Sequence, residues 1–71
     1  MNKWLLEVRK QEIRRYLAQN RIVSMFWISE NGSRARAWDQ MVRDGEISVR
    51  ALEFPMYRVT VHQKRKKGQN T

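Results

Sequence analysis

The residues best suited to chemistry lie between positions 34 and 43, where arginine and glutamine recur at helical spacing. A helix over residues 34–43 places Arg36, Gln40 and Arg43 on one face, beside Asp39. Arginine can donate two hydrogen bonds to guanine O6 and N7, and glutamine can pair with adenine N6 and N7. Because a major groove about 12 Å wide admits one helix, these residues predict contacts with base edges. The alternative is a solvated helix face without a ligand.

Several further residues suit contacts with phosphate rather than with bases. Ser33 is predicted to cap the helix, and with Arg34 it would meet phosphate at the helix N-terminus, where free N–H groups and the dipole favour anions. Asp39 is expected to pair with Arg36 or Arg43, or to accept a hydrogen bond from cytosine N4. The other predicted phosphate contacts are the basic residues Arg50, Arg58, Lys64, Arg65, Lys66 and Lys67.

Catalytic chemistry finds no support in the residue types. The chain has no Cys and one His, His62, which is predicted at a strand end beside a basic tail. A lone general base needs a pocket in which to act. The carboxylates are scattered along the sequence, and it contains no glycine loop of the phosphate-binding type. We therefore expect no enzyme activity, no metal site and no cofactor.

The charge of the chain points to a polyanionic partner. Its 71 residues include 15 Lys and Arg against 7 Asp and Glu, for a formal charge of +8. Residues 64–67 supply four of these charges, which leaves +4 on residues 1–63. Because 41% of the residues are hydrophobic and seven are aromatic, we expect one packed domain over residues 1–62. Residues 63–71 are expected to form a disordered basic tail that adds affinity for phosphates.

The cellular setting follows from two absences in the sequence. No apolar run approaches the roughly 18 residues that a membrane span needs. The absence of Cys removes any argument for an oxidising compartment. We expect an intracellular protein without a membrane partner.

Hydrophobic periodicity predicts the elements that must position these residues. Residues 3–19 form a helix that ends at Asn20. Its predicted core-facing residues are Leu5, Leu6, Ile13, Tyr16 and Leu17. The helix over residues 34–43 ends at Asp44 and Gly45, with Ala37 at the edge of its polar face. Its predicted apolar face consists of Ala35, Trp38, Met41 and Val42.

The remaining segments are a hairpin and one ambiguous stretch. Residues 47–62 alternate apolar and polar side chains in two runs, which is typical of two strands. The connection Leu52-Glu53-Phe54-Pro55-Met56 is an unusually apolar hairpin tip. Residues 22–29 suit a strand by composition, or a short helix capped by Ser24. In that segment Phe26 and Trp27 are expected in the core, as is Trp38.

The order of helix, short helix, tight turn, basic helix and hairpin resembles the winged helix-turn-helix DNA-binding domain. The resemblance rests on Val23 to Ile47, VSMFWISENGSRARAWDQMVRDGEI, which contains an Asn-Gly turn and an ending Met41-Val42, Asp44, Gly45 and Ile47. It favours the helix for residues 22–29. The sequence departs from the family at two places. Residues 22–29 lack small residues, and the predicted hairpin tip carries Phe54, Pro55 and Met56 in place of glycine and basic residues.

The resemblance implies a small α+β winged helix-turn-helix with two to three helices followed by a β-hairpin wing. It implies a sequence-specific protein that binds double-stranded DNA through residues 34–43. Such a protein would be a phage or bacterial transcriptional regulator, or an architectural factor of recombination or replication, in the bacterial cytoplasm or nucleoid.

Two other functions stay open at this point. An apolar hairpin tip suits a homodimer contact or a protein partner, through Leu52, Phe54 and Met56. The protein would then be a small inhibitor or adaptor. RNA binding through Trp27, Tyr57 and the basic tail is the second alternative.

Overall fold

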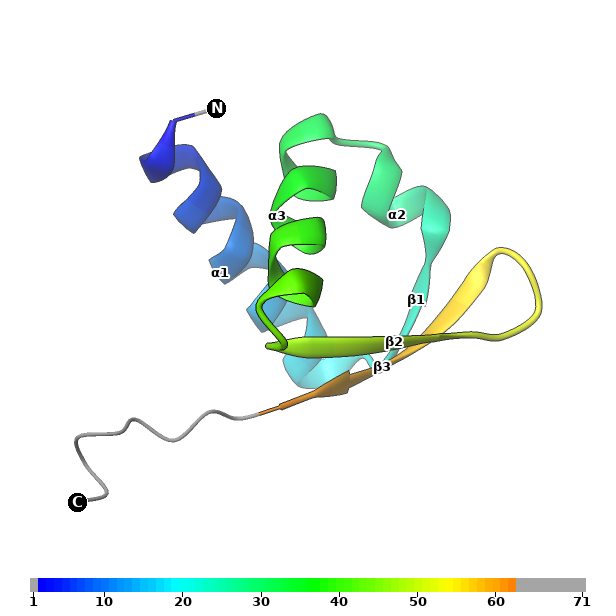
Figure 1. Cartoon of the computed structure of the whole chain (residues 1–71). Helices are drawn as coiled ribbons and strands as arrows, with labels where there is room; N and C mark the ends of the chain where they lie inside the picture. Colours follow the sequence, from blue (N-terminus) through cyan, green and yellow to red (C-terminus); the bar gives the residue numbers. More distant parts are fainter. Residues whose placement is uncertain (1, 63–71) are drawn as a thin grey trace, which may run out of the picture.

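The structure is a computed structural model that describes residues 2–62 (Figure 1). Its elements follow in the order α1 (Lys3–Gln19), β1 (Ile22–Ser24), α2 (Met25–Ser29), α3 (Gly32–Arg43), β2 (Ile47–Ala51) and β3 (Met56–Val61). The strands form one antiparallel sheet in the order β1-β3-β2. This confirms the predicted α+β fold of helices followed by a β-hairpin.

The first helix begins and ends as predicted. The side chain of Asn2 accepts a hydrogen bond from the Leu5 amide at 2.9 Å, and Asn20 closes the other end with its backbone N–H on the Tyr16 carbonyl. Ile13 and Leu17 are fully buried, and Tyr16 packs against the core from one side. Leu6 does the same, whereas Leu5 is half-buried and lies outside the core cluster.

The ambiguous segment contains both of its predicted structures, one after the other. Residues 22–24 pair with β3, with Val23 opposite Tyr57, and Ser24 then caps α2 by accepting a hydrogen bond from the Phe26 amide at 3.0 Å. The short helix capped by Ser24 is confirmed over Met25–Ser29, and the strand that the composition suits is limited to Ile22–Ser24. The free edge of β3 explains this, because pairing with it satisfies the backbone groups around the fully buried Val23.

The third helix starts earlier than predicted and presents a different face to the core. Asn31, not Ser33, is the cap, and its Oδ1 accepts hydrogen bonds from the amides of Ser33 and Arg34 at 3.0 and 3.1 Å. The buried residues of the helix are Arg34, Ala37, Trp38 and Met41. Val42 is 39% exposed and Ala35 half-buried, so the predicted apolar face was wrong at these two positions.

The end of α3 and the hairpin follow the sequence closely. Gly45 has a φ of 77°, the left-handed conformation that ends the helix and that glycine adopts without strain. In the hairpin, Ile47 lies opposite Val61 and Val49 opposite Val59, which gives the sheet its inner face. The eight buried apolar residues form one core: Ile13, Leu17, Val23, Ala37, Trp38, Met41, Ile47 and Val59.

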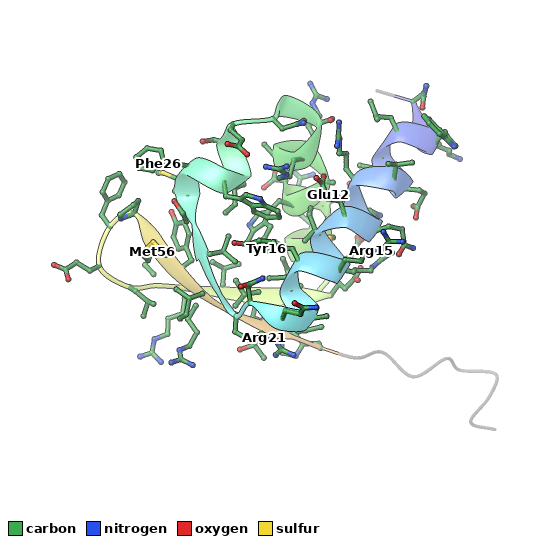
Figure 2. The ribbon with its side chains drawn as sticks, turned by 180° about the vertical axis from the view of Figure 1, so that it is seen from behind. Glu12, Arg15, Tyr16, Arg21, Phe26 and Met56 are labelled. Atoms are coloured by element: carbon green, nitrogen blue, oxygen red, sulfur yellow. The ribbon has the colours of Figure 1, made fainter. Side chains whose placement is uncertain are left out.

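The aromatic residues divide between the core and the surface. Trp38 is 7% exposed, as predicted. Trp27 is half-buried and stacks on Tyr16 of α1 at 4.1 Å between ring centroids, with the edge of Trp38 at 6.4 Å. Phe26 is 59% exposed, so its predicted place in the core was wrong. It lies on the outer side of the short helix α2, away from α1 and α3 (Figure 2).

Candidate nucleic-acid interface

The three residues predicted to read bases lie together on α3. Arg36 and Arg43 are exposed and Gln40 is half-buried, and with Asp39 they line a shallow groove that Leu6 of α1 borders. This face points away from the core side of α3, because the buried residues Ala37 and Met41 lie opposite. The groove therefore gathers two guanidinium groups and one amide at the surface.

The polar groups on this face are held only loosely. Gln40 Nε2 donates to Asp44 Oδ1 at 3.0 Å. Arg43 Nη2 lies 3.9 Å from Asp39 Oδ2, with both side chains about 70% exposed, and Arg36 makes no ion pair within residues 2–62. Exposed pairs of this kind contribute little free energy. The side chains can thus exchange these contacts for others at small cost.

Arg34 has a different place from the one expected for a phosphate contact. It is 8% exposed, and its guanidinium group lies 4.2 Å from the Trp27 ring centroid. Nη1 donates to the Trp27 carbonyl at 2.6 Å and to Glu30 at 2.9 Å, and Nη2 donates to Glu12 at 3.0 Å. Glu12 lies on the side of α1 that faces α3 (Figure 2). Arg34 therefore joins α1, α2 and α3 from inside the protein.

Ser33 also has internal partners. Its Oγ accepts a hydrogen bond from Arg9 Nε and donates to Asn31 Oδ1, both at 2.8 Å. The amides of Ser33 and Arg34 already donate to Asn31. The N-terminus of α3 is consequently occupied by its own cap, and the predicted anion contact there has no free donor at these two amides.

Ion pairs with α1 stabilise the position of α3 and the start of β2. The hydrogen bond from Arg34 holds the pKa of Glu12 below its ordinary value, despite the opposing effect of burial. Arg14 makes two hydrogen bonds to Glu46, which likewise lower the pKa of that carboxyl. Lys10 Nζ lies 3.7 Å from Glu7 and 4.0 Å from Asp44.

These pairs decide where the free positive charge lies. Five of the seven carboxylates, those of Glu7, Glu12, Glu30, Asp44 and Glu46, pair with cations of α1 or with Arg34. Within residues 2–62, the cations without an ion pair are Lys3, Arg15, Arg21, Arg36, Arg50 and Arg58. Three of them, Arg36, Arg50 and Arg58, are among the residues predicted to bind nucleic acid.

Arg50 and Arg58 face each other across the hairpin. They form a directly opposite pair in the register of β2 and β3, and both are exposed on the outer face of the sheet. Ile22 of β1 lies on the other side of Arg58. Like charges directly opposite on a sheet are unfavourable by a few tenths of a kcal/mol to about 1 kcal/mol. An anion placed between the two guanidinium groups would remove this repulsion.

The hairpin tip is apolar and exposed. Phe54 is 70% and Leu52 41% exposed, and Met56 is half-buried where it pairs with Ser24. The ring of Phe54 meets the ring of Phe26 edge-on, with 5.9 Å between centroids. The contact between Phe26 and the tip had no signal in the sequence, because it depends on how α2 and the hairpin meet in space.

The remaining predictions concern His62, metal ligands, the basic residues 64–67 and membrane spans. His62 is exposed at the end of β3, where its Nε2 lies 2.6 Å from Ser48 Oγ. No cluster of three possible metal ligands occurs among residues 2–62. The predicted phosphate contacts Lys64, Arg65, Lys66 and Lys67 lie outside the described residues. None of the helices described is both long and apolar enough to cross a bilayer.

Comparisons with known proteins give no relative. No protein-family model, no curated protein sequence and no solved structure matches the chain. Any function must therefore be argued from the site itself.

Proposed function

We propose that the chain is a sequence-specific double-stranded DNA-binding protein of the winged helix-turn-helix type. In this proposal α3 enters the major groove and the β2–β3 hairpin is the wing. The protein would serve a phage or bacterium as a transcriptional regulator or as an architectural factor of recombination or replication, without catalytic activity.

The arrangement of the elements supports this proposal. The short helix α2 and the helix α3 are joined through Glu30 and Asn31, and the hairpin follows α3 directly after Gly45. This is the order of support helix, turn, recognition helix and wing that the sequence resemblance implies. Arg34 and the Tyr16–Trp27 stack fix α2 and α3 on α1, so that the outer face of α3 is held at a set angle.

The observation that carries the proposal is the separation of paired from unpaired arginines. Five of the seven carboxylates pair with cations of α1 or with Arg34, while Arg36 of α3 and the opposed Arg50 and Arg58 of the hairpin are exposed and make no ion pair within residues 2–62. Exposed arginines on one helix and on the adjoining hairpin are the donors that base edges and phosphates require.

Contacts with bases are assigned to Arg36, Gln40 and Arg43, and contacts with phosphate to Arg50, Arg58 and the basic residues 64–67. Ser33 and Arg34 are left out of this assignment because their side chains have internal partners.

A selection from random duplexes at two salt concentrations tests the proposal. If four to six phosphates are neutralised, log K should fall with log[salt] with a slope of about −4 to −5. A matched pair of variants separates the site from general charge, because Arg36→Ala should lose base preference whereas Arg15→Ala should keep it. Arg15 is exposed and unpaired like Arg36, but it lies on the far side of α1 (Figure 2). Affinity for no duplex, or affinity independent of salt, contradicts the proposal.

A further inference from the structure

The apolar hairpin tip is built as a fixed projection. The Met25 amide donates to the Pro55 carbonyl at 2.7 Å, which ties the tip to the start of α2. Inside the tip, the Leu52 amide donates to Met56 at 3.0 Å and the Met56 amide donates to Glu53 at 2.9 Å. Phe26 supports the ring of Phe54 from the side. A projection held in this way loses little conformational freedom on binding.

The surroundings of the tip indicate what it meets. Arg50 and Arg58 lie on the two strands, each two residues before or after the apolar residues Leu52 and Met56. A protein partner that covers the tip with an apolar surface would also bring that surface against two guanidinium groups, which need anionic partners. A nucleic-acid groove meets both requirements, an anionic edge and an apolar interior, since phosphates line its edges and stacked bases lie inside. Proteins that bend DNA insert Phe, Leu, Ile, Met or Pro between base steps in the minor groove.

We propose that Phe54 of the hairpin tip inserts at a base step in the minor groove and bends the duplex. Arg50 and Arg58 then bind the phosphates on either side of that step. This inference rests on the proposed function and adds a distortion of the DNA that binding by α3 does not require.

The dimensions of the molecule permit both contacts at once. The strand β2 and Leu52 lead from the end of α3 to the turn that forms the tip, and this path corresponds to about 17 Å at 3.3 Å per residue. Adjacent major and minor grooves lie about half a helical turn apart, or about 17 Å. Figure 1 shows the tip reaching well beyond α2 and α3 to one side. The hairpin can therefore reach the minor groove next to the major groove that α3 occupies.

Glu53 of the tip should repel the phosphates of the DNA backbone. It is exposed and makes no ion pair within residues 2–62. A carboxylate beside phosphates lowers affinity by repulsion. Replacement by Glu53→Gln should thus raise affinity for duplex DNA by about twofold to fivefold at low salt, with bending retained.

Cyclisation of short DNA tests the bending without knowledge of a binding site. The probe is a linear duplex of about 100 base pairs with cohesive ends, shorter than the persistence length of about 150 base pairs. Full-length protein is added at concentrations that give equal bound fractions for each variant, measured by gel shift. The cyclisation rate under DNA ligase should rise at least tenfold with wild-type protein and return to that of free DNA with Phe54→Ala.

Two variants control for other causes. Trp4→Ala removes an aromatic side chain that is 71% exposed, like Phe54 at 70%, and it should cyclise DNA like wild type. Trp4 belongs to the first turn of α1, and Figure 1 shows the start of this helix at the end of the molecule opposite the hairpin tip. Phe54→Leu keeps an apolar wedge and should retain most of the effect. Thermal denaturation of each variant verifies that it is folded.

The possible outcomes separate the two proposals. Bound but unbent duplex, or equal bending by Phe54→Ala, overturns the insertion and leaves the proposed function standing. So does a finding that Phe54→Ala affects only self-association or binding of a protein. Absence of salt-sensitive duplex binding by wild-type protein, or preference for single strands, overturns the proposed function and the insertion together.

Discussion

Two arginines of α3, two residues apart, occupy opposite environments. Arg34 is 8% exposed, carries two carboxylate partners and lies against Trp27. Arg36 is exposed and has no ion pair among residues 2–62. The helix directs one side chain into the protein and the other out of it, since successive residues turn by about 100°. Net charge alone would count them equally, and the position of the carboxylates distinguishes the internal arginine from the exposed one.

The largest change in stability is expected from removing the internal contacts of Arg34. Arg34→Met removes the donors to Glu12, Glu30 and the Trp27 carbonyl, and it leaves Glu12 with Arg9 as its remaining partner. The free energy of unfolding should fall by about 2–3 kcal/mol, because the half-buried Glu12 and the Trp27 carbonyl each lose a donor, whereas the exposed Glu30 can bind water instead. Urea denaturation measures the change. Arg36→Met serves as the control and should change stability by less than about 0.5 kcal/mol, and equal effects of the two would refute the distinction.

Substitution of an exposed arginine of α3 should have the reverse effect, with lower affinity for DNA and unchanged stability. Arg43→Ala removes an exposed guanidinium group whose nearest carboxylate is 3.9 Å away, so stability should hardly change. Affinity for the selected duplex should fall by about 1–3 kcal/mol with a relaxed preference at one base pair, as for loss of a bidentate contact. Fluorescence anisotropy with the selected duplex and a scrambled duplex gives both quantities. A uniform loss on the two duplexes would assign Arg43 to phosphate instead.

Acid should weaken the ion pairs of Glu12 with Arg34 and of Glu46 with Arg14, and so lower the stability of the fold. The pKa values of Glu12 and Glu46 are lowered by Arg34 and Arg14 respectively. A carboxyl with a lowered pKa in the folded state contributes stability above its unfolded pKa, near the ordinary value of 4.5, and this stability is lost as pH falls through the folded pKa. Thermal unfolding should therefore move to lower temperature as pH falls below about 4.5. The double substitution Glu12→Gln and Glu46→Gln should reduce that slope, and an unchanged slope would show that other groups cause it.

The smallest effect concerns the opposed arginines of the hairpin. Arg50→Thr removes one of two like charges that face each other and introduces a residue suited to strands. The protein without DNA should become more stable by about 0.2–1 kcal/mol, although its affinity for DNA falls. Stability measured at low and high salt provides the control, because screening should shrink the difference. A gain that does not depend on salt would come from strand propensity alone.

The periodic parts of the chain were predictable from sequence. The helix over residues 3–19, its end at Asn20, the left-handed Gly45 and the alternation of residues 47–61 follow from local rules of capping and burial. The pairing of β1 was not predictable, because it depends on the edge of β3, more than thirty residues later. The segment 22–29 contains too few residues for a periodicity to decide between helix and strand.

The candidate site was predicted in part, for a physical reason that Arg34 illustrates. Spacing alone put Arg36, Gln40 and Arg43 on one face of a helix, and they lie together. Spacing could not place Arg34, whose environment is decided by Glu12 of a different helix. The i,i+4 spacing of Glu30 and Arg34 was the one local signal for a pair. Phe26 lacked any such signal, since its partner Phe54 is remote in the sequence.

The hydrogen bond from the Met25 amide to the Pro55 carbonyl fixes the distance between the hairpin tip and the helices. It joins the tip to the start of α2, and α2 is in turn held to α3 through Arg34. On the proposed function, the distance along the DNA between the base contacts of α3 and the step met by Phe54 is then constant. One base pair inserted between them would rotate the two contacts apart by about 35°. The spacing of the target, as much as its bases, would be read by this chain.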